Sequence, residues 1–176
     1  MDQTELQELN RHFTDLEFIK TTFDNVQVPN QLFPITKEVP VPILVTEAQR
    51  DDDLTNTAPV QIMFLPTIRI MGETKLLQFY APIPEVDLSS ADNKVSSDTL
   101  ALLNQVVPLG CFSPDSENKL FYRYVYSSPL FEIPNEKVLL EVYGLYAAVL
   151  LEYKDHLLKL QNGEITEAEL LKELSS

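Results

Sequence analysis

The apolar positions change their period along the chain, from helical spacing to strand-like runs and back. Strand-like runs occupy 43–46, 60–71 and 76–81, and Pro66 inside the second run predicts an edge strand, a bulge or two short strands in series. Before these runs, apolar residues recur every three or four positions, which predicts a helix whose buried face is formed by Leu6, Leu9, Phe13, Leu16 and Ile19.

The second half of the chain repeats this alternation of helices and strands. Ser96 or Ser97 can cap a helix that Pro108 ends, and the runs 109–112 and 120–126 around a turn-forming segment predict a hairpin. Asn135 is a suitable N-cap for a long helix over 135–161. The apolar stripe of that helix is predicted to consist of Val138, Val142, Leu145, Val149 and Tyr153, widened by Leu139, Tyr146 and Leu150.

These elements predict an α+β fold with the order α-β-β-β-α-β-β-α and a short C-terminal helix. At 176 residues the chain suits a single domain, 1–176, because this length allows a sizeable core. Within it, the four prolines of segment 25–42 favour an extended connection, and the tail 164–176 is predicted to be helical because Thr166 and Glu169 have capping-box spacing.

Charge and cysteine content narrow the class of partner. A net charge of −14 repels nucleic acids and anionic membranes, whereas it attracts a basic partner. Cys111 is the only cysteine, so no intrachain disulfide can form, and the first thirty residues contain no continuous apolar block. We therefore expect a cytoplasmic protein that binds neither nucleic acid nor membranes.

The residues that could carry chemistry are few. Glu152 and His156 share a helical spacing, but two ligands are too few for a metal site. Asp51, Asp52 and Asp53 lack the spacing of a calcium loop, so they are interpreted as the solvated tip of a hairpin. The loop 85–94 is interpreted as mobile, and Cys111 as a small buried strand residue. We predict no catalytic, metal or cofactor site.

The run 120–126 has apolar character on both faces. Tyr122, Tyr124 and Tyr126 alternate on one side, and Phe121, Arg123 and Val125 on the other. The second face must be covered either by helices of the same chain or by a second protomer.

The segment order, together with LLQFYAPIP at 76–84, LLNQVVPLGCF at 102–112 and the strand 120–126, resembles the YbjN family, which is similar in fold to the class I type III secretion chaperones. The resemblance covers about residues 4–161. It implies an antiparallel sheet with helices packed on it and a protein-binding, often homodimeric module without a catalytic centre. The long connection 25–42 and the tail after Gly163 depart from the family pattern.

We therefore expect a non-catalytic, chaperone-like or adaptor-like module that binds a polypeptide through apolar sheet and helix surface, and we expect it to form a homodimer. The surface residues predicted to take part are Phe121, Arg123 and Val125. The alternative function is a small-molecule-binding regulatory domain, with a pocket between the sheet and the long helix lined by Tyr124 and Tyr146. A third hypothesis, an enzyme, requires Glu152, His156 and another acid to converge in a cleft.

Overall fold

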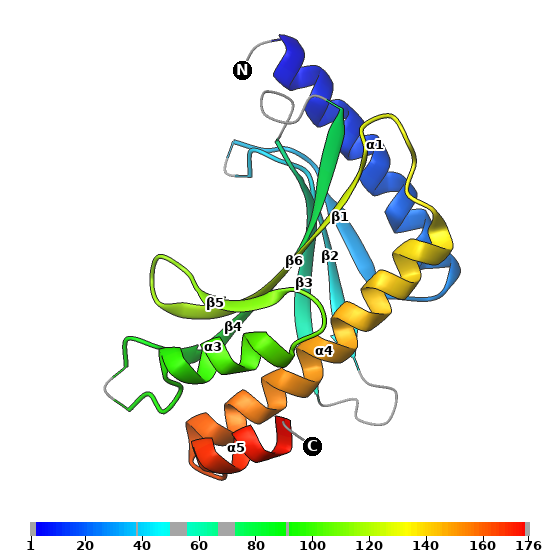
Figure 1. Ribbon diagram of the computed structural model, residues 1–176. Coiled ribbons are helices and arrows are strands. Elements are labelled where there is room, and N and C mark those ends of the chain that lie inside the picture. Colours follow the sequence, from blue (N-terminus) through cyan, green and yellow to red (C-terminus); the bar gives the residue numbers. More distant parts are fainter. Residues whose placement is uncertain (1–2, 38, 50–55, 67–72, 91, 175–176) are drawn as a thin grey trace. The chain divides into compact units, whose positions relative to one another are not determined.

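The computed structural model describes residues 3–37, 39–49, 56–66, 73–90 and 92–174, with four helices and six strands among them (Figure 1). The expected segment order is confirmed, with one strand added near the start. The elements are α1 (Gln3–Asn25), β1 (Asn30–Phe33), β2 (Ile43–Gln49), β3 (Thr57–Leu65), β4 (Thr74–Asp87), α3 (Ser97–Val106), β5 (Cys111–Pro114), β6 (Lys119–Pro129), α4 (Glu136–Asn162) and α5 (Glu167–Leu174).

The strands form one antiparallel sheet in the order β1-β2-β3-β4-β6-β5. The added strand is β1, which lies inside the segment expected to be an extended connection. Its register places Asn30 opposite Thr46 and Phe33 opposite Ile43. Pro29 and Pro34 bound β1 on both sides, so the prolines that exclude a helix leave room for a four-residue edge strand.

The chain divides into two compact units, each assembled from three stretches. Unit 1 consists of Met1–Glu47, Pro59–Phe79 and Val125–Gly144. Unit 2 consists of Ala48–Ala58, Tyr80–Tyr124 and Leu145–Ser176. Five elements contribute residues to both units: β2, β3, β4, β6 and α4.

Helix caps form where the sequence predicts them. Ser96 Oγ accepts the Thr99 N–H at 2.9 Å at the start of α3, and Asn135 Oδ1 accepts the Val138 N–H at 3.2 Å at the start of α4. At the start of α5, the Thr166 N–H donates to Glu169 Oε2 at 2.8 Å, and the Glu169 N–H donates to Thr166 Oγ1 at 3.3 Å. This reciprocal pair is the predicted capping box.

The buried face of α1 differs from the predicted stripe. Leu6 is exposed, and Phe13 is only half-buried. The residues that pack inward recur at spacings of three and four and include a histidine: Leu9, His12, Leu16, Ile19 and Phe23. The polar residues Glu8 and Asp15 are buried beside them.

The buried face of α4 also differs from the predicted stripe. Val138 and Leu145 are exposed, Leu145 by 48%, whereas Val149 is buried as expected. The residues predicted only to widen the stripe form the centre of the buried face: Leu139, Tyr146 and Leu150. Compared with the predicted stripe, the buried face is shifted toward the tyrosines of α4. Buried tyrosines contribute a large apolar area together with a hydroxyl that finds a hydrogen-bond partner.

Strand β4 extends further than predicted. It continues through Pro82 and Pro84 to Asp87, so the first residues of the expected loop 85–94 belong to a strand. Because the two prolines are two residues apart, their missing N–H groups face the same neighbouring strand, and only one ladder is interrupted. The turn after β4 is held by the Ser89 N–H and hydroxyl, which both donate to Asp87 Oδ1. Asp51, Asp52 and Asp53 lie outside the described residues.

Cys111 was expected to be buried, but it is exposed on β5. It lies on the opposite side of the strand from buried Phe112, and it pairs with Arg123 of β6. The residue before it, Gly110, has φ +74, and a Cβ there would lie 2.6 Å from the Arg123 carbonyl oxygen. Only glycine fits this approach of the chain to β6.

Candidate functional site

Unit 1 has one sheet face packed against α1 and α4, and no helix of unit 1 among the described residues packs on its other face. On the helix-covered face, His12 of α1 stacks on Phe64 of β3 with ring centroids 4.9 Å apart, and Tyr143 of α4 lies 3.3 Å from Thr46 of β2 (hydroxyl oxygens). Side chains of the other face alternate with these along the strands. They include half-buried or exposed apolar residues, with the polar Gln61, Thr74 and Gln78 between them: Phe33, Ile43, Val45, Pro59, Met63, Leu65, Leu76 and Val125. We call these residues the outer face of unit 1.

Unit 2 carries the predicted surface residues Phe121 and Arg123 of β6. Both are half-buried, and they alternate with buried Leu120 and Tyr122. Phe121 lies beside Tyr80 of β4, with ring centroids 5.1 Å apart. Burial, with a smaller effect of the Asp115 carboxylate, raises the pKa of Tyr80. The third predicted surface residue, Val125, belongs to the outer face of unit 1.

The two tyrosines predicted to line an internal pocket lie on the helix-covered face of unit 2. Tyr146 is fully buried, its ring stacks on Tyr122 at 4.8 Å, and its hydroxyl donates to the Tyr122 carbonyl at 3.1 Å. Tyr122 in turn stacks on Phe112 and donates its hydroxyl to the Leu109 carbonyl. Tyr124 is half-buried on the same side of β6. Aromatic rings therefore fill the space around Tyr146.

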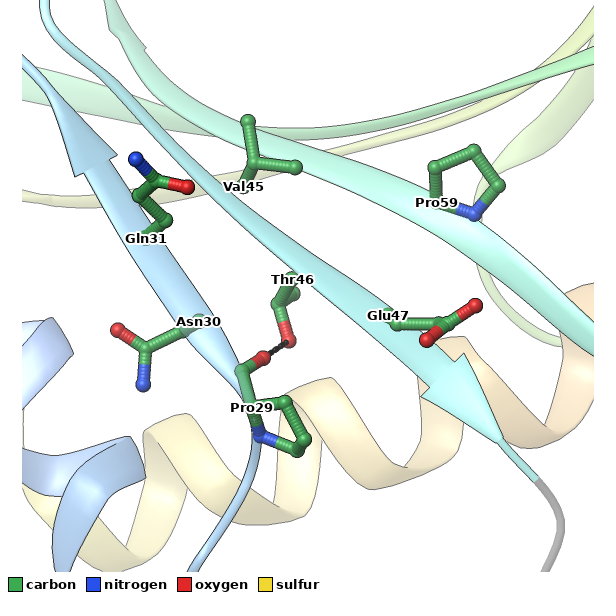
Figure 2. Close-up of a pocket in the computed structure, with 7 residues that line it drawn as sticks. All are labelled: Pro29, Asn30, Gln31, Val45, Thr46, Glu47 and Pro59. Carbon is green, nitrogen blue, oxygen red and sulfur yellow. Dashed lines mark hydrogen bonds between the residues drawn. The ribbon is translucent and has the colours of Figure 1, made fainter.

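An open depression of about 400 Å³ lies in unit 1, where β1 and β2 meet. Figure 2 shows the Glu47 carboxylate beside Pro59 and the Gln31 amide beside Val45, at opposite ends of the depression. The Thr46 hydroxyl is engaged by the Pro29 carbonyl at 2.7 Å. The Glu47 backbone is held from the helix side, because the Tyr143 hydroxyl donates to the Glu47 carbonyl at 3.2 Å. The Glu47 side chain is exposed.

A cluster of ionisable side chains is buried between α1 and the sheet of unit 1. Lys75 of β4 donates to Asp15 Oδ2 at 2.7 Å, and its ammonium lies 5.5 Å from the centroid of the Phe64 ring. His12 is fully buried, and neither ring nitrogen has a hydrogen-bond partner among the described residues. Its Nε2 lies 3.9 Å from Glu8 Oε1, which is too long for a hydrogen bond.

The environment of His12 favours its neutral form. Burial lowers the pKa of His12, and the neighbouring Lys75 and Arg11 act in the same direction. The Glu8 and Asp15 carboxylates oppose this shift in part. A neutral imidazole packed on Phe64 is a structural core residue rather than a proton donor at neutral pH.

The residues weighed as metal ligands belong to the contact between α4 and α5. His156 Nε2 lies 3.1 Å from Glu173 Oε2, and His156 Nδ1 lies 2.8 Å from the Glu152 carbonyl oxygen. Among the described residues no group of three or more His, Cys, Asp or Glu side chains has the geometry to hold a metal ion. In the same part of the chain, no helix is both long and apolar enough to cross a membrane.

Comparison of the chain with protein-family models and with curated proteins finds no match. The fold and the contacts described above therefore carry the functional argument.

Phe121, Arg123 and Val125 alternate with Tyr122 and Tyr124 along β6, whereas the sequence pattern does not predict the outer face of β2 and β3 or the cluster around His12. The signal for the cluster was present, because His12 occupies one position of the three-four spacing that joins Leu9 to Phe23. The depression could not be found, since it depends on the strand β1 that the pattern does not predict.

Proposed function

We propose that the chain is a non-catalytic, chaperone-like or adaptor-like module that binds a polypeptide. The outer face of unit 1 carries this proposal. Apolar side chains that no described helix of unit 1 covers are costly to leave in water, and exposed apolar surface of this kind marks interaction sites. The resemblance to the YbjN family and the secretion chaperones points to the same class of activity.

A partner for this face should be apolar with some basic residues. The apolar side chains supply the contact area, and the net charge of −14 attracts cations over a longer range. The exposed cysteine on β5 fits a reducing compartment, and we propose the cytoplasm. The small-molecule alternative receives less support, because the rings of Tyr122 and Phe112 pack around Tyr146.

Site-specific crosslinking tests the proposal. A photoreactive amino acid at Met63, on the outer face, should capture a defined polypeptide in the native host. The same amino acid at Leu102, an exposed apolar residue of α3, should not. Adding Val45→Asp to the Met63 crosslinker should abolish capture while the chain stays folded, because Val45 is half-buried and not among the buried core residues. Equal capture from Met63 and Leu102 would refute the proposal, as would native mass spectra in which the chain retains a small molecule instead.

A further inference from the structure

We propose that the depression at the end of β1 and β2 binds an arginine side chain of the polypeptide partner. This inference rests on the proposed function and deepens it, because it names one residue that the partner supplies. Its elements are a carboxylate at one end, flat apolar walls, and a polar amide at the other end: Glu47, Pro29, Val45, Pro59 and Gln31.

The apolar walls of the depression suit a guanidinium. Pro59 lies beside the Glu47 carboxylate in Figure 2, Pro29 also lines the depression, and proline rings present flat apolar surface without N–H donors. A guanidinium is planar and weakly hydrated, so it can lie on such a surface while its edge donates hydrogen bonds. A lysine ammonium is compact and strongly hydrated, and it would lose more hydration for the same charge contact.

The polar side chains of the depression differ in whether they already have hydrogen-bond partners. No hydrogen bond or ion pair engages the side chains of Glu47 and Gln31 within the described part of the chain. Of the other polar side chains, the Thr46 hydroxyl is hydrogen-bonded to Pro29 and Tyr143. The Asn30 amide nitrogen donates to Asp24 and to the Val28 carbonyl, while Asn30 Oδ1 is buried without a partner among the described residues. Glu47 is therefore the negative acceptor available to a ligand, and a guanidinium matches a carboxylate with two parallel hydrogen bonds.

The depression lies on the outer face of unit 1. Val45, Glu47 and Pro59 line the depression, and all three lie on the side of the strands that forms the outer face of unit 1. A polypeptide lying on Met63 and Val45 could therefore place one side chain in the depression without leaving the apolar surface. The acidic net charge adds attraction to any cation there.

The experiment uses small probes, so that it does not depend on finding the partner. N-acetyl-arginine amide is titrated into the ¹⁵N-labelled chain, with N-acetyl-citrulline amide as the neutral isostere and N-acetyl-lysine amide as the second cation. We expect saturable shifts at the amides of Gln31, Thr46 and Glu47 with arginine and none with citrulline. Glu47→Gln should weaken arginine binding about fivefold to tenfold, the range for a partly exposed charged hydrogen-bonding pair. Glu17→Gln, an equal charge change on the exposed side of α1, should leave it unchanged.

Equal binding of citrulline or lysine would overturn the inference, as would arginine shifts that Glu47→Gln does not alter. Failure of the proposed function has a different signature. Arginine would then bind at Glu47 while the Met63 crosslinker captures no polypeptide. Conversely, a captured polypeptide whose affinity is indifferent to Glu47→Gln would support the function and remove the arginine site.

Discussion

The Lys75 ammonium donates to the Asp15 carboxylate at 2.7 Å, and the two side chains are 1% and 10% exposed. The pair joins the middle of α1 to β4 within unit 1. Burying two charges costs hydration free energy, and the contact between the charges roughly offsets this cost. Removing one partner leaves the cost of the other charge without compensation, which destabilises the fold.

We predict that Lys75→Met lowers the free energy of unfolding by about 3–5 kcal/mol, because it leaves the Asp15 carboxylate buried without a partner. The matched control is Lys20→Met. Lys20 forms an ion pair of similar length with Asp24, at 2.6 Å, but both side chains are exposed to solvent. The control should cost less than about 1 kcal/mol. Chemical denaturation of both variants measures this difference, and equal losses would show that the buried pair does not anchor α1.

We predict that His12 makes the protein less stable as the pH falls. Because burial lowers its pKa in the folded state below the ordinary value of 6.5, the unfolded chain binds more protons in this range. The contribution of His12 is therefore complete above the unfolded pKa and is lost progressively as the pH falls from about 6.5 toward the folded pKa.

The test compares wild type with His12→Phe, which removes the titrating group and keeps a ring against Phe64. The difference in stability between the two proteins should change between pH 7 and pH 5, with wild type losing relative to the variant. A difference that stays constant over this range would contradict a lowered pKa. An imidazole titration followed by NMR gives the folded value directly.

Two leucines of α4 distinguish the buried face from the predicted stripe. Leu150 is fully buried and Leu145 is 48% exposed, and both belong to unit 2. Leu150→Ala should lower the free energy of unfolding by about 2–5 kcal/mol, the range for a truncated core leucine. Leu145→Ala should cost less than about 1 kcal/mol, because exposed positions tolerate truncation. Denaturant midpoints of the two variants measure these losses. A larger loss of stability in Leu145→Ala than in Leu150→Ala would favour the stripe predicted from the sequence.

These residues also show how far a single sequence predicts the structure. The order of strands and helices follows from the spacing of apolar residues and from the helix-capping residues. Asn135 caps α4, and Thr166 and Glu169 form the capping box of α5, as predicted. The rotation of a helix about its axis does not follow, because several neighbouring faces of α1 and α4 are apolar. The sheet decides between them through contacts distant in sequence, such as Phe64 with His12 and Tyr122 with Tyr146.

The sequence pattern does not predict the depression or the outer face, for a related reason. Val45 and Met63 lie in runs whose alternation predicts a buried and an exposed side, but not which side the helices cover. That choice is made by the inward side chains at Thr46, Phe64 and Lys75, which meet α1 and α4. The same holds for Cys111. Its side chain is exposed because the next residue, Phe112, occupies the buried side of β5.

The connection between β6 and α4 holds the two most exposed large apolar residues among the described residues. Phe131 is 79% and Ile133 is 63% exposed, and the Arg11 guanidinium lies 4.8 Å from the centroid of the Phe131 ring. Apolar side chains so exposed on a charged protein favour contact with a second copy, and the family resemblance implies a homodimer.

We predict a homodimer that buries this connection. Specific dimers bury roughly 1,200–2,000 Å² in total, so the dimer should persist at micromolar concentration. Light scattering over a dilution series should give twice the chain mass, and the double variant Phe131→Ser with Ile133→Ser should give the monomer mass at every concentration. Leu102→Ser, which removes an exposed leucine of α3, is the control and should stay dimeric. A wild-type monomer at all concentrations would exclude the homodimer. A dimer that survives in the double variant would place its interface elsewhere, with the outer face of unit 1 the next surface to test by Val45→Asp.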